Sequence, residues 1–229
     1  MLSTGTLDAV TLDADAAVAN ATTLVVRNGL TLANGHRVVI TGGGNTTTLK
    51  FTGSSQTLDG SGEVVFGGGG TSNLAANLNA GETLTLGTGI TTHISATGSA
   101  GSIQANSAIV NQGSIVANGS GKTLALSGSL FTNAGTLSAV SGGVLALTGS
   151  YTTARLGALV NDGTGKILLG NGSIAGGTLD NLGTTLTLDG TTGSLTLDGG
   201  TIQGGTVRGL EGAGLAVLST GTLDAVTLD

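Results

Sequence analysis

Short runs in which an aliphatic residue alternates with a small polar residue recur along the whole chain and leave few folds open. Typical runs are residues 82–87 (ETLTLG), 122–128 (KTLALSG) and 184–190 (TTLTLDG). A period of two places alternate side chains on opposite faces of a β-strand, and Gly, Asn and Asp between the runs suit tight turns. The best helical stretch, residues 14–20, is too short and uncapped. The pattern predicts an all-β fold of very short strands.

A twelve-residue sequence, LSTGTLDAVTLD, occurs twice without a change, at residues 2–13 and 218–229. We interpret residues 2–217 as one unit of a tandem array and residues 218–229 as the start of the next copy, so that residues 1–229 form a single repetitive segment. Because a β-sandwich rarely continues into its own next copy, this repeat favours a solenoid of stacked coils.

A shorter repeat, Asn-x-Gly after a hydrophobic position, recurs at intervals of roughly 20 to 30 residues, which matches the length of solenoid coils. We expect the glycine to supply a positive φ, the asparagine to bond the turn backbone, and stacked amides to form a ladder. The motif residues are Asn111, Gly113, Asn133, Gly135, Asn161, Gly163, Asn181 and Gly183. With no proline to interrupt interior strands and a right-handed rule for parallel crossovers, the sequence predicts a right-handed parallel β-helix, or β-solenoid, with Gly/Asn turns.

Alternation also predicts which side chains fill the narrow interior. The aromatic residues Phe51, Phe66, Phe131 and Tyr151 are expected to fill the core or plug strand ends. The leucines expected to point inward are Leu84, Leu86, Leu124, Leu126, Leu145, Leu147, Leu186, Leu188, Leu195 and Leu197.

Composition argues against several classes of partner and site. The net charge is −6 and the seven basic residues are scattered, so a nucleic-acid partner is not expected. No apolar run approaches the roughly 18 residues that a membrane helix needs. The absence of cysteine excludes disulfides and thiolate metal sites.

Candidate metal ligands are few and dispersed. His36 and His93 are expected to be surface residues of separate strands rather than a metal pair. Aspartates that follow Thr-Leu suggest either calcium binding or turn capping, and capping is favoured because the tandem Gly-Gly-x-Gly-x-Asp nonapeptide is missing. These aspartates are Asp8, Asp13, Asp59, Asp180, Asp189, Asp198, Asp224 and Asp229. No cofactor is expected, with calcium as the alternative.

The sequence does not favour an enzyme. Glu63, Glu82 and Glu211 are far apart, and a polysaccharide-cleaving site would need clustered carboxylates. Residues 67–70 (GGGG) lack the lysine and the following helix of a phosphate loop, so a turn or bulged corner is expected. A Thr array that binds ice, as Thr83 and Thr85 could suggest, would need coils of constant length.

The strings in residues 5–35, 55–70, 108–121, 130–149 and 193–209 resemble the β-strand-repeat proteins of bacteria and their relatives, the filamentous-haemagglutinin-type adhesins. This resemblance implies a right-handed parallel β-helix in a very large secreted or surface protein, and no catalytic residue. We therefore expect a structural module of an extracellular bacterial fibre or adhesin stalk. The alternative is a module that binds glycans or another cell.

The duplicated ends predict contacts between copies. Residues 2–13 are expected to stack on the coil that contains residues 205–217, which would join neighbouring copies head to tail. The residues expected to make this end-to-end contact are Thr6, Leu7, Val10, Leu215, Val217, Leu223 and Val226. Lateral contacts between fibres and contacts with surface glycans are further expectations.

Overall fold

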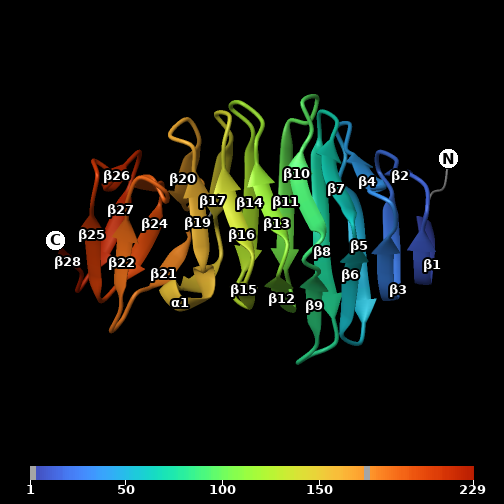
Figure 1. Cartoon of the computed structure of the whole chain (residues 1–229), viewed down its shortest axis with the longest axis horizontal. Helices are drawn as coiled ribbons and strands as arrows, with labels where there is room; N and C mark the ends of the chain where they lie inside the picture. The colour runs from blue at the N-terminus through green and yellow to red at the C-terminus, as the bar shows by residue number, and fades with distance from the viewer. Residues whose placement is uncertain (1–3, 173–175) are drawn as a thin grey trace.

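The computed structural model describes residues 4–172 and 176–229 and shows a β-solenoid whose coils stack from an N-terminal end to a C-terminal end (Figure 1). Each full coil passes over three faces, which we number in chain order. The strand pairs are all parallel. The predicted parallel β-helix is therefore confirmed.

Face 1 holds ten stacked strands, two of which continue onto face 2. These two are β1 (Thr4–Leu12) and β3 (Thr23–Leu32), and β3 pairs with β5 through residues 23–26 and with β6 (Gln56–Gly60) through residues 30–32. The others on face 1 are β5 (Thr47–Gly53), β8 (Thr71–Leu78), β11 (Ala100–Ala105), β14 (Thr123–Gly128), β17 (Val144–Leu147), β20 (Lys166–Leu169), β23 (Leu195–Leu197) and β26 (Leu215–Val217).

Faces 2 and 3 complete each coil. After β6, face 2 holds β9 (Thr83–Leu86), β12 (Ala108–Asn111), β15 (Phe131–Asn133), β18 (Ser150–Thr152), β21 (Thr178–Asp180), β24 (Gly200–Gln203) and β27 (Gly221–Asp224). Face 3 holds β2 (Ala16–Val18), β4 (Arg37–Thr41), β7 (Gly62–Gly67), β10 (Ile90–Ile94), β13 (Ser114–Ala117), β16 (Thr136–Ala139), β19 (Ala158–Asn161), β22 (Thr185–Leu188), β25 (Thr206–Gly209) and β28 (Thr227–Leu228).

One coil departs from this regular pattern. The single helix of the described residues, α1 (Thr153–Leu156), lies between β18 and β19, and the hydroxyl of its N-cap Thr152 accepts a hydrogen bond from the Arg155 amide. The described pairings on face 2 stop at β15 and resume with β18, and those on face 3 stop at β19 and resume with β22. Within the described residues, face 1 alone has strand pairings that continue from the first coil to the last.

The interior is a set of aliphatic columns with one rung per coil. The longest column on face 1 consists of Leu24, Leu49, Leu74, Ile103, Leu126, Leu147, Leu169, Leu197 and Val217. Every rung between the two ends is buried, and each buried leucine contributes about 1.5–3 kcal/mol. The ten leucines predicted to point inward are all buried, and so are Phe51, Phe66, Phe131 and Tyr151.

The coils differ in length. From Thr4 the chain returns to the same position of the next coil at Thr23, which pairs with Thr4. From Thr71 the chain returns only at Ala100, so this coil is much longer. The turns absorb this variation, because the strands within each face stay in parallel register. The strands on each face therefore keep their spacing despite the variable coil length, and the ice-binding alternative stays a prediction.

Candidate functional site

The C-terminal end coil leaves the apolar cross-section of the solenoid open. Val217, Leu223 and Leu228 stack on buried Leu197, Ile202 and Val207, respectively. Within the described chain no further coil covers them, and they are 62%, 41% and 59% exposed. This end is an apolar surface bordered by three strand edges.

The N-terminal end coil is open in the same way. Leu7, Val10 and Leu12 of β1 pack on the core, where they stack on Val26, Leu30 and Leu32 of β3. Their other side is uncovered in the described residues, so they are only half-buried. The first and last described coils therefore have matching architecture, and together they form the candidate site for contacts between copies.

Six of the seven residues predicted to make end-to-end contacts lie on the two end coils with inward positions: Leu7, Val10, Leu215, Val217, Leu223 and Val226. The seventh, Thr6, also lies on β1, where it pairs with Val25 on the outer surface of face 1 and is exposed. It lies beside the apolar cross-section, and its end-to-end contact stays a prediction.

The two identical copies occupy different faces. In the first copy, Gly5–Asp8 lies on face 1 and Val10–Leu12 on face 2, as parts of β1. In the second copy, β27 lies on face 2 and β28 on face 3. Both copies turn the corner at the same alanine, with a positive φ of 52° at Ala9 and 54° at Ala225. The sequence thus specifies one local shape, and its place on the coil depends on what precedes it.

The predicted partner of the second copy needs correction. Residues 205–217 were expected to carry it, but β27 pairs with Gly200–Gln203 and only β28 pairs within the expected stretch, on Thr206 and Val207. The strand β26 lies in the same coil as the second copy, because Leu215–Val217 occupies face 1 beside β23.

The Asn-x-Gly motifs form a shorter ladder than predicted. Asn111 donates to Asn133 Oδ1 at 2.7 Å, and Asn133 donates to the Leu156 carbonyl at 3.0 Å. Thr153 takes the ladder position in the next coil and donates to Asn181 Oδ1 at 2.7 Å. Asn161 ends β19 and lies at the corner between faces 3 and 1, so it does not belong to this ladder.

The glycines of these motifs have two distinct roles. Gly163 and Gly183 adopt the predicted positive φ, at 83° and 69°. Gly113 and Gly135 do not, and the prediction was wrong for them. A Cβ on Gly135 would lie 2.0 Å from the Gly113 carbonyl oxygen, so glycine is needed there because stacked backbones approach closely.

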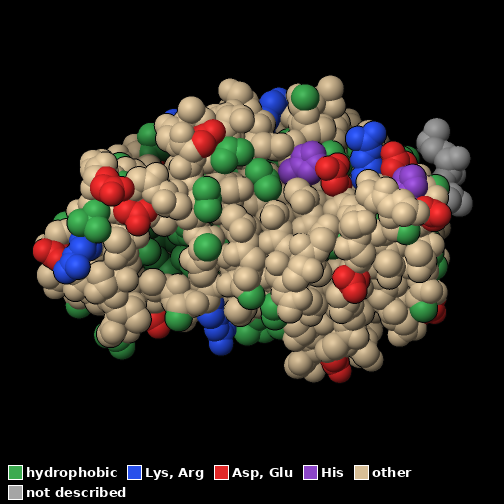
Figure 2. All heavy atoms as spheres, in the orientation of Figure 1, with side chains coloured by type: hydrophobic (Ala, Val, Ile, Leu, Met, Phe, Trp, Pro, Cys, Tyr) green, Lys and Arg blue, Asp and Glu red, His purple; other side chains and the backbone are tan. Residues whose placement is uncertain are grey.

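Charged side chains gather on one edge near the N-terminal end, as Figure 2 shows. His36 Nδ1 lies 3.1 Å from Asp15 Oδ1 and its Nε2 lies 3.5 Å from Asp13 Oδ1. Arg37 Nε donates to Asp15 at 3.1 Å, and these contacts, led by the one from His36, lower the pKa of Asp15. Sequence reasoning missed this cluster, although the offset of 21 or 22 residues between acid and base is one coil length.

His93 lies on β10, where its Nε2 is 3.4 Å from Glu63 Oε2. The other two glutamates also bind the protein itself: Ser55 donates its amide to Glu82, and Gly190 donates its amide to Glu211. Within residues 4–172 and 176–229, no group of three or more His, Asp or Glu side chains is placed to hold a metal ion. The calcium alternative and the expected lack of catalysis stay predictions.

The aspartates that follow Thr-Leu cap turns at several positions. Asp180 Oδ1 accepts from the Leu182 amide at 3.0 Å. Asp189 Oδ1 accepts from the Thr192 hydroxyl and amide, which lowers the pKa of Asp189. The strongest case lies outside the predicted set: the Thr164 hydroxyl and the Ser141 amide donate to Asp162 and hold its pKa far below the usual range.

The Asp162 cap predicts a pH-dependent stability. Because the folded pKa is depressed, the carboxylate stabilises the fold above its unfolded pKa of about 3.9, and this contribution is lost as pH falls toward the folded pKa. Asp162→Asn should lower the melting temperature near about pH 7, and the difference from the parent chain should shrink below about pH 4. Calorimetry of Asp59→Asn, which changes an exposed carboxylate that forms no hydrogen bond within the described residues, is the control. A difference for Asp162→Asn that is independent of pH would contradict the assignment.

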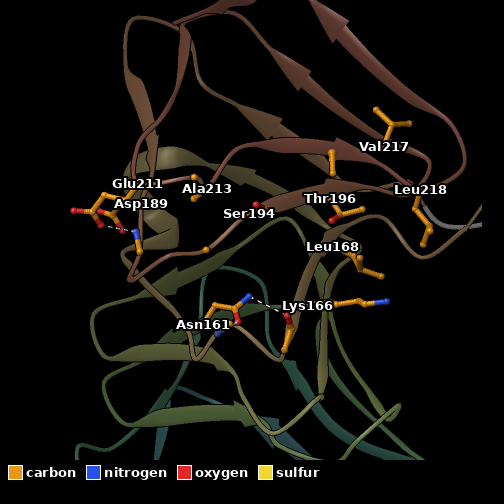
Figure 3. A pocket seen from close by; sticks show the side chains of 16 residues that line it. Asn161, Lys166, Leu168, Asp189, Ser194, Thr196, Glu211, Ala213, Val217 and Leu218 are labelled. Carbon is orange, nitrogen blue, oxygen red and sulfur yellow. Dashed lines mark hydrogen bonds between the residues drawn. The ribbon is translucent and has the colours of Figure 1, made fainter.

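A shallow groove of about 490 Å³ crosses the last coils (Figure 3). Asp189 and Glu211 lie together at one end, while the side chain of Lys166 extends away from them. Both carboxylates already accept hydrogen bonds from turn backbone, so the groove does not present them as a free acid pair. This arrangement fits turn stabilisation better than sugar cleavage.

Comparisons with protein-family models, curated proteins and solved structures gave no match for this chain. The resemblance to β-strand-repeat and filamentous-haemagglutinin-type proteins therefore stays a prediction. In the described part of the chain, the helical content includes no segment of the length and apolar character needed to cross a membrane.

Proposed function

We propose that this chain is a repeating structural module of an extracellular bacterial fibre or adhesin stalk, in which copies follow one another along one solenoid. One observation carries the proposal: the repeated sequence forms strands in both the first and the last described coil, with Gly, Leu, Val and Leu at the inward positions each time. A segment that forms two faces of a coil at either end can link one unit to the next. At about 4.8 Å per coil, one unit would extend the rod by about 45 Å.

The open ends predict that separate copies of the chain associate head to tail. The apolar cross-sections and unpaired strand edges would cover one another in a contact that does not close, so linear assemblies should grow with concentration. In analytical ultracentrifugation the average mass of the parent chain should rise with concentration. The double variant Leu223→Lys and Leu228→Lys should stay monomeric, because two charges would enter the contact.

Leu182→Lys is the matched control, since Leu182 is 77% exposed on the turn between β21 and β22, two coils before the last coil. It should assemble as the parent chain does. A parent chain that is monomeric at every concentration, with slow hydrogen exchange in β1 and β28, would show that the ends are already covered and would contradict the proposal.

The surface location requires a separate test. Antibodies raised against the folded chain should label intact bacteria that make the protein, and electron microscopy should place the label along thin extensions. Label that appears only after the cells are permeabilised would overturn the extracellular role and leave the solenoid assembly unaffected.

A further inference from the structure

We propose that consecutive units of the array are rotated by one face, so that each unit advances the solenoid by nine coils and one face. This inference rests on the proposed tandem array and specifies how a unit contacts the next copy of itself. It starts from the finding that Gly5–Asp8 lies on face 1, whereas the identical Gly221–Asp224 lies on face 2. Nine steps separate the ten strands stacked on face 1 from β1 to β26.

The face of the second copy is fixed by chain length. Val217 ends β26 on face 1, and only Leu218, Ser219 and Thr220 lie between it and Gly221. To return to face 1 in the next coil, the chain would have to pass over faces 2 and 3 first. Three residues are too few for this, because even the short coil from Thr4 to its partner Thr23 uses a far longer stretch of chain. Gly221–Asp224 is therefore confined to face 2, where it pairs with β24.

The next strand of the following copy is then fixed by pairing. In the first copy β1 pairs with β3 along its length, and the shift at Ala9 matches the corner at Asn28, whose side chain donates to Asp8 at 2.6 Å. The second copy repeats the sequence of β1 and its corner at Ala225. In the array, the second copy would pair with β3 of the following copy as β1 pairs with β3 in the first copy. Because the second copy lies on faces 2 and 3, this pairing would place that β3 on faces 2 and 3.

Face 1 of the coil after β26 is then left for β2 of the following copy. After the second copy ends on face 3, Ala16–Val18 comes next in the chain and would stack on Leu215–Val217 of β26. The inward and outward positions agree: Val18 is buried and would cover exposed Val217, while Ala17 would lie beside Ala216 on the outer surface. Val18 would extend the long aliphatic column into the next unit.

The rotation has a consequence for the surface of the fibre. A feature confined to one edge of the unit, such as the Asp13, Asp15, His36 and Arg37 cluster, would appear on a different side in each of three consecutive units. The array would then repeat in orientation every three units, and a partner could meet the same surface from three directions.

Disulfide trapping in two fused copies, residues 1–217 followed by residues 2–229, tests the rotation. The chain has no cysteine, so introduced pairs report without competition. Neighbouring outward residues on stacked strands lie about 4.8 Å apart, within the range for a disulfide. Ala216→Cys in the first copy should cross-link with Ala17→Cys in the following copy, to an extent similar to the control pair Ser102→Cys and Ala125→Cys within one copy.

The unrotated alternative predicts a different pair. In this alternative the second copy of the repeat stays on faces 2 and 3, but β3 of the following copy returns to face 1 and stacks on β26. Thr23→Cys of that copy would then lie beside Ala216→Cys. Cross-linking of this pair instead would overturn the rotation and leave the tandem solenoid intact. Failure of both pairs, with rapid proteolysis between the copies while the control pair still forms, would overturn the tandem proposal and the rotation together.

Discussion

Leu126→Asp is expected to lower the free energy of unfolding by at least about 4 kcal/mol, or to prevent folding. Leu126 is 1% exposed and forms a middle rung of the long column on face 1, between Ile103 and Leu147. A carboxylate there would lose its hydration and gain no partner, because the surrounding rungs are hydrocarbon. Urea denaturation followed by circular dichroism measures the loss.

Two further variants make this result interpretable. Leu126→Ala removes the side chain without adding charge and should cost about 3 kcal/mol, so it stays measurable if the aspartate variant does not fold. Leu182→Asp adds the same charge at an exposed turn and should change stability by less than about 0.5 kcal/mol. Equal effects of Leu126→Asp and Leu182→Asp would mean that the column does not hold the coils together.

Stability in a solenoid is a sum of coil terms and contacts between neighbouring coils. Hydrogen exchange in Leu126→Ala should therefore increase most in β11, β14 and β17, and least in the end coils. Uniform loss of protection along the chain would indicate that the solenoid unfolds as one unit.

The sequence was sufficient to predict the interior because strand alternation does not depend on coil length. In Thr123–Gly128, the residues at every second position point inward whatever turn precedes them, and Leu124 and Leu126 are buried as expected. The same reasoning assigned Leu145 and Leu147 of β17.

Spacing along the chain could not predict which corner a motif occupies. Asn133 and Asn161 are separated by about one coil length, yet Asn133 ends a strand on face 2 and Asn161 a strand on face 3. In this coil Thr153 takes the position after the face-2 strand, and the next Asn-x-Gly follows β19, which the Asn-x-Gly pattern does not reveal. The duplicated segment carries the same lesson, since its face is set by the preceding strand.

The polar cluster at the N-terminal edge shows a third limit. Asp15 and His36 are neighbours because turns of particular length bring them into adjacent coils. Their contact could be anticipated only once the coil length at that position was known, and this length varies along the chain. Searching for opposite charges about one coil apart would have flagged the pair among many others.

Gly149→Ala is expected to cost at least about 3 kcal/mol, although it adds a single methyl group. A Cβ at Gly149 would lie 1.9 Å from the Gly128 carbonyl oxygen, which belongs to the backbone of the preceding coil. Neither the backbone at Gly149 nor that at Gly128 can move away without disturbing the neighbouring coil. Thr148 donates its amide to the Leu126 carbonyl at 2.8 Å, and Thr178 donates to the Gly149 carbonyl at 2.9 Å, so separating the coils would strain hydrogen bonds on both sides.

Gly69→Ala provides the matched control, because a Cβ there meets nothing within 4 Å and its φ is not in the left-handed region. Its free energy of unfolding should stay within about 0.5 kcal/mol of the parent chain. The comparison separates close stacking of coils from the general effect of replacing glycine by alanine on the unfolded chain. If both variants were equally stable, coil spacing near Gly149 would have to be wider than the structure indicates. A large loss confined to Gly149→Ala would instead show that glycine content in this chain follows the approach of stacked backbones as well as the demands of turns.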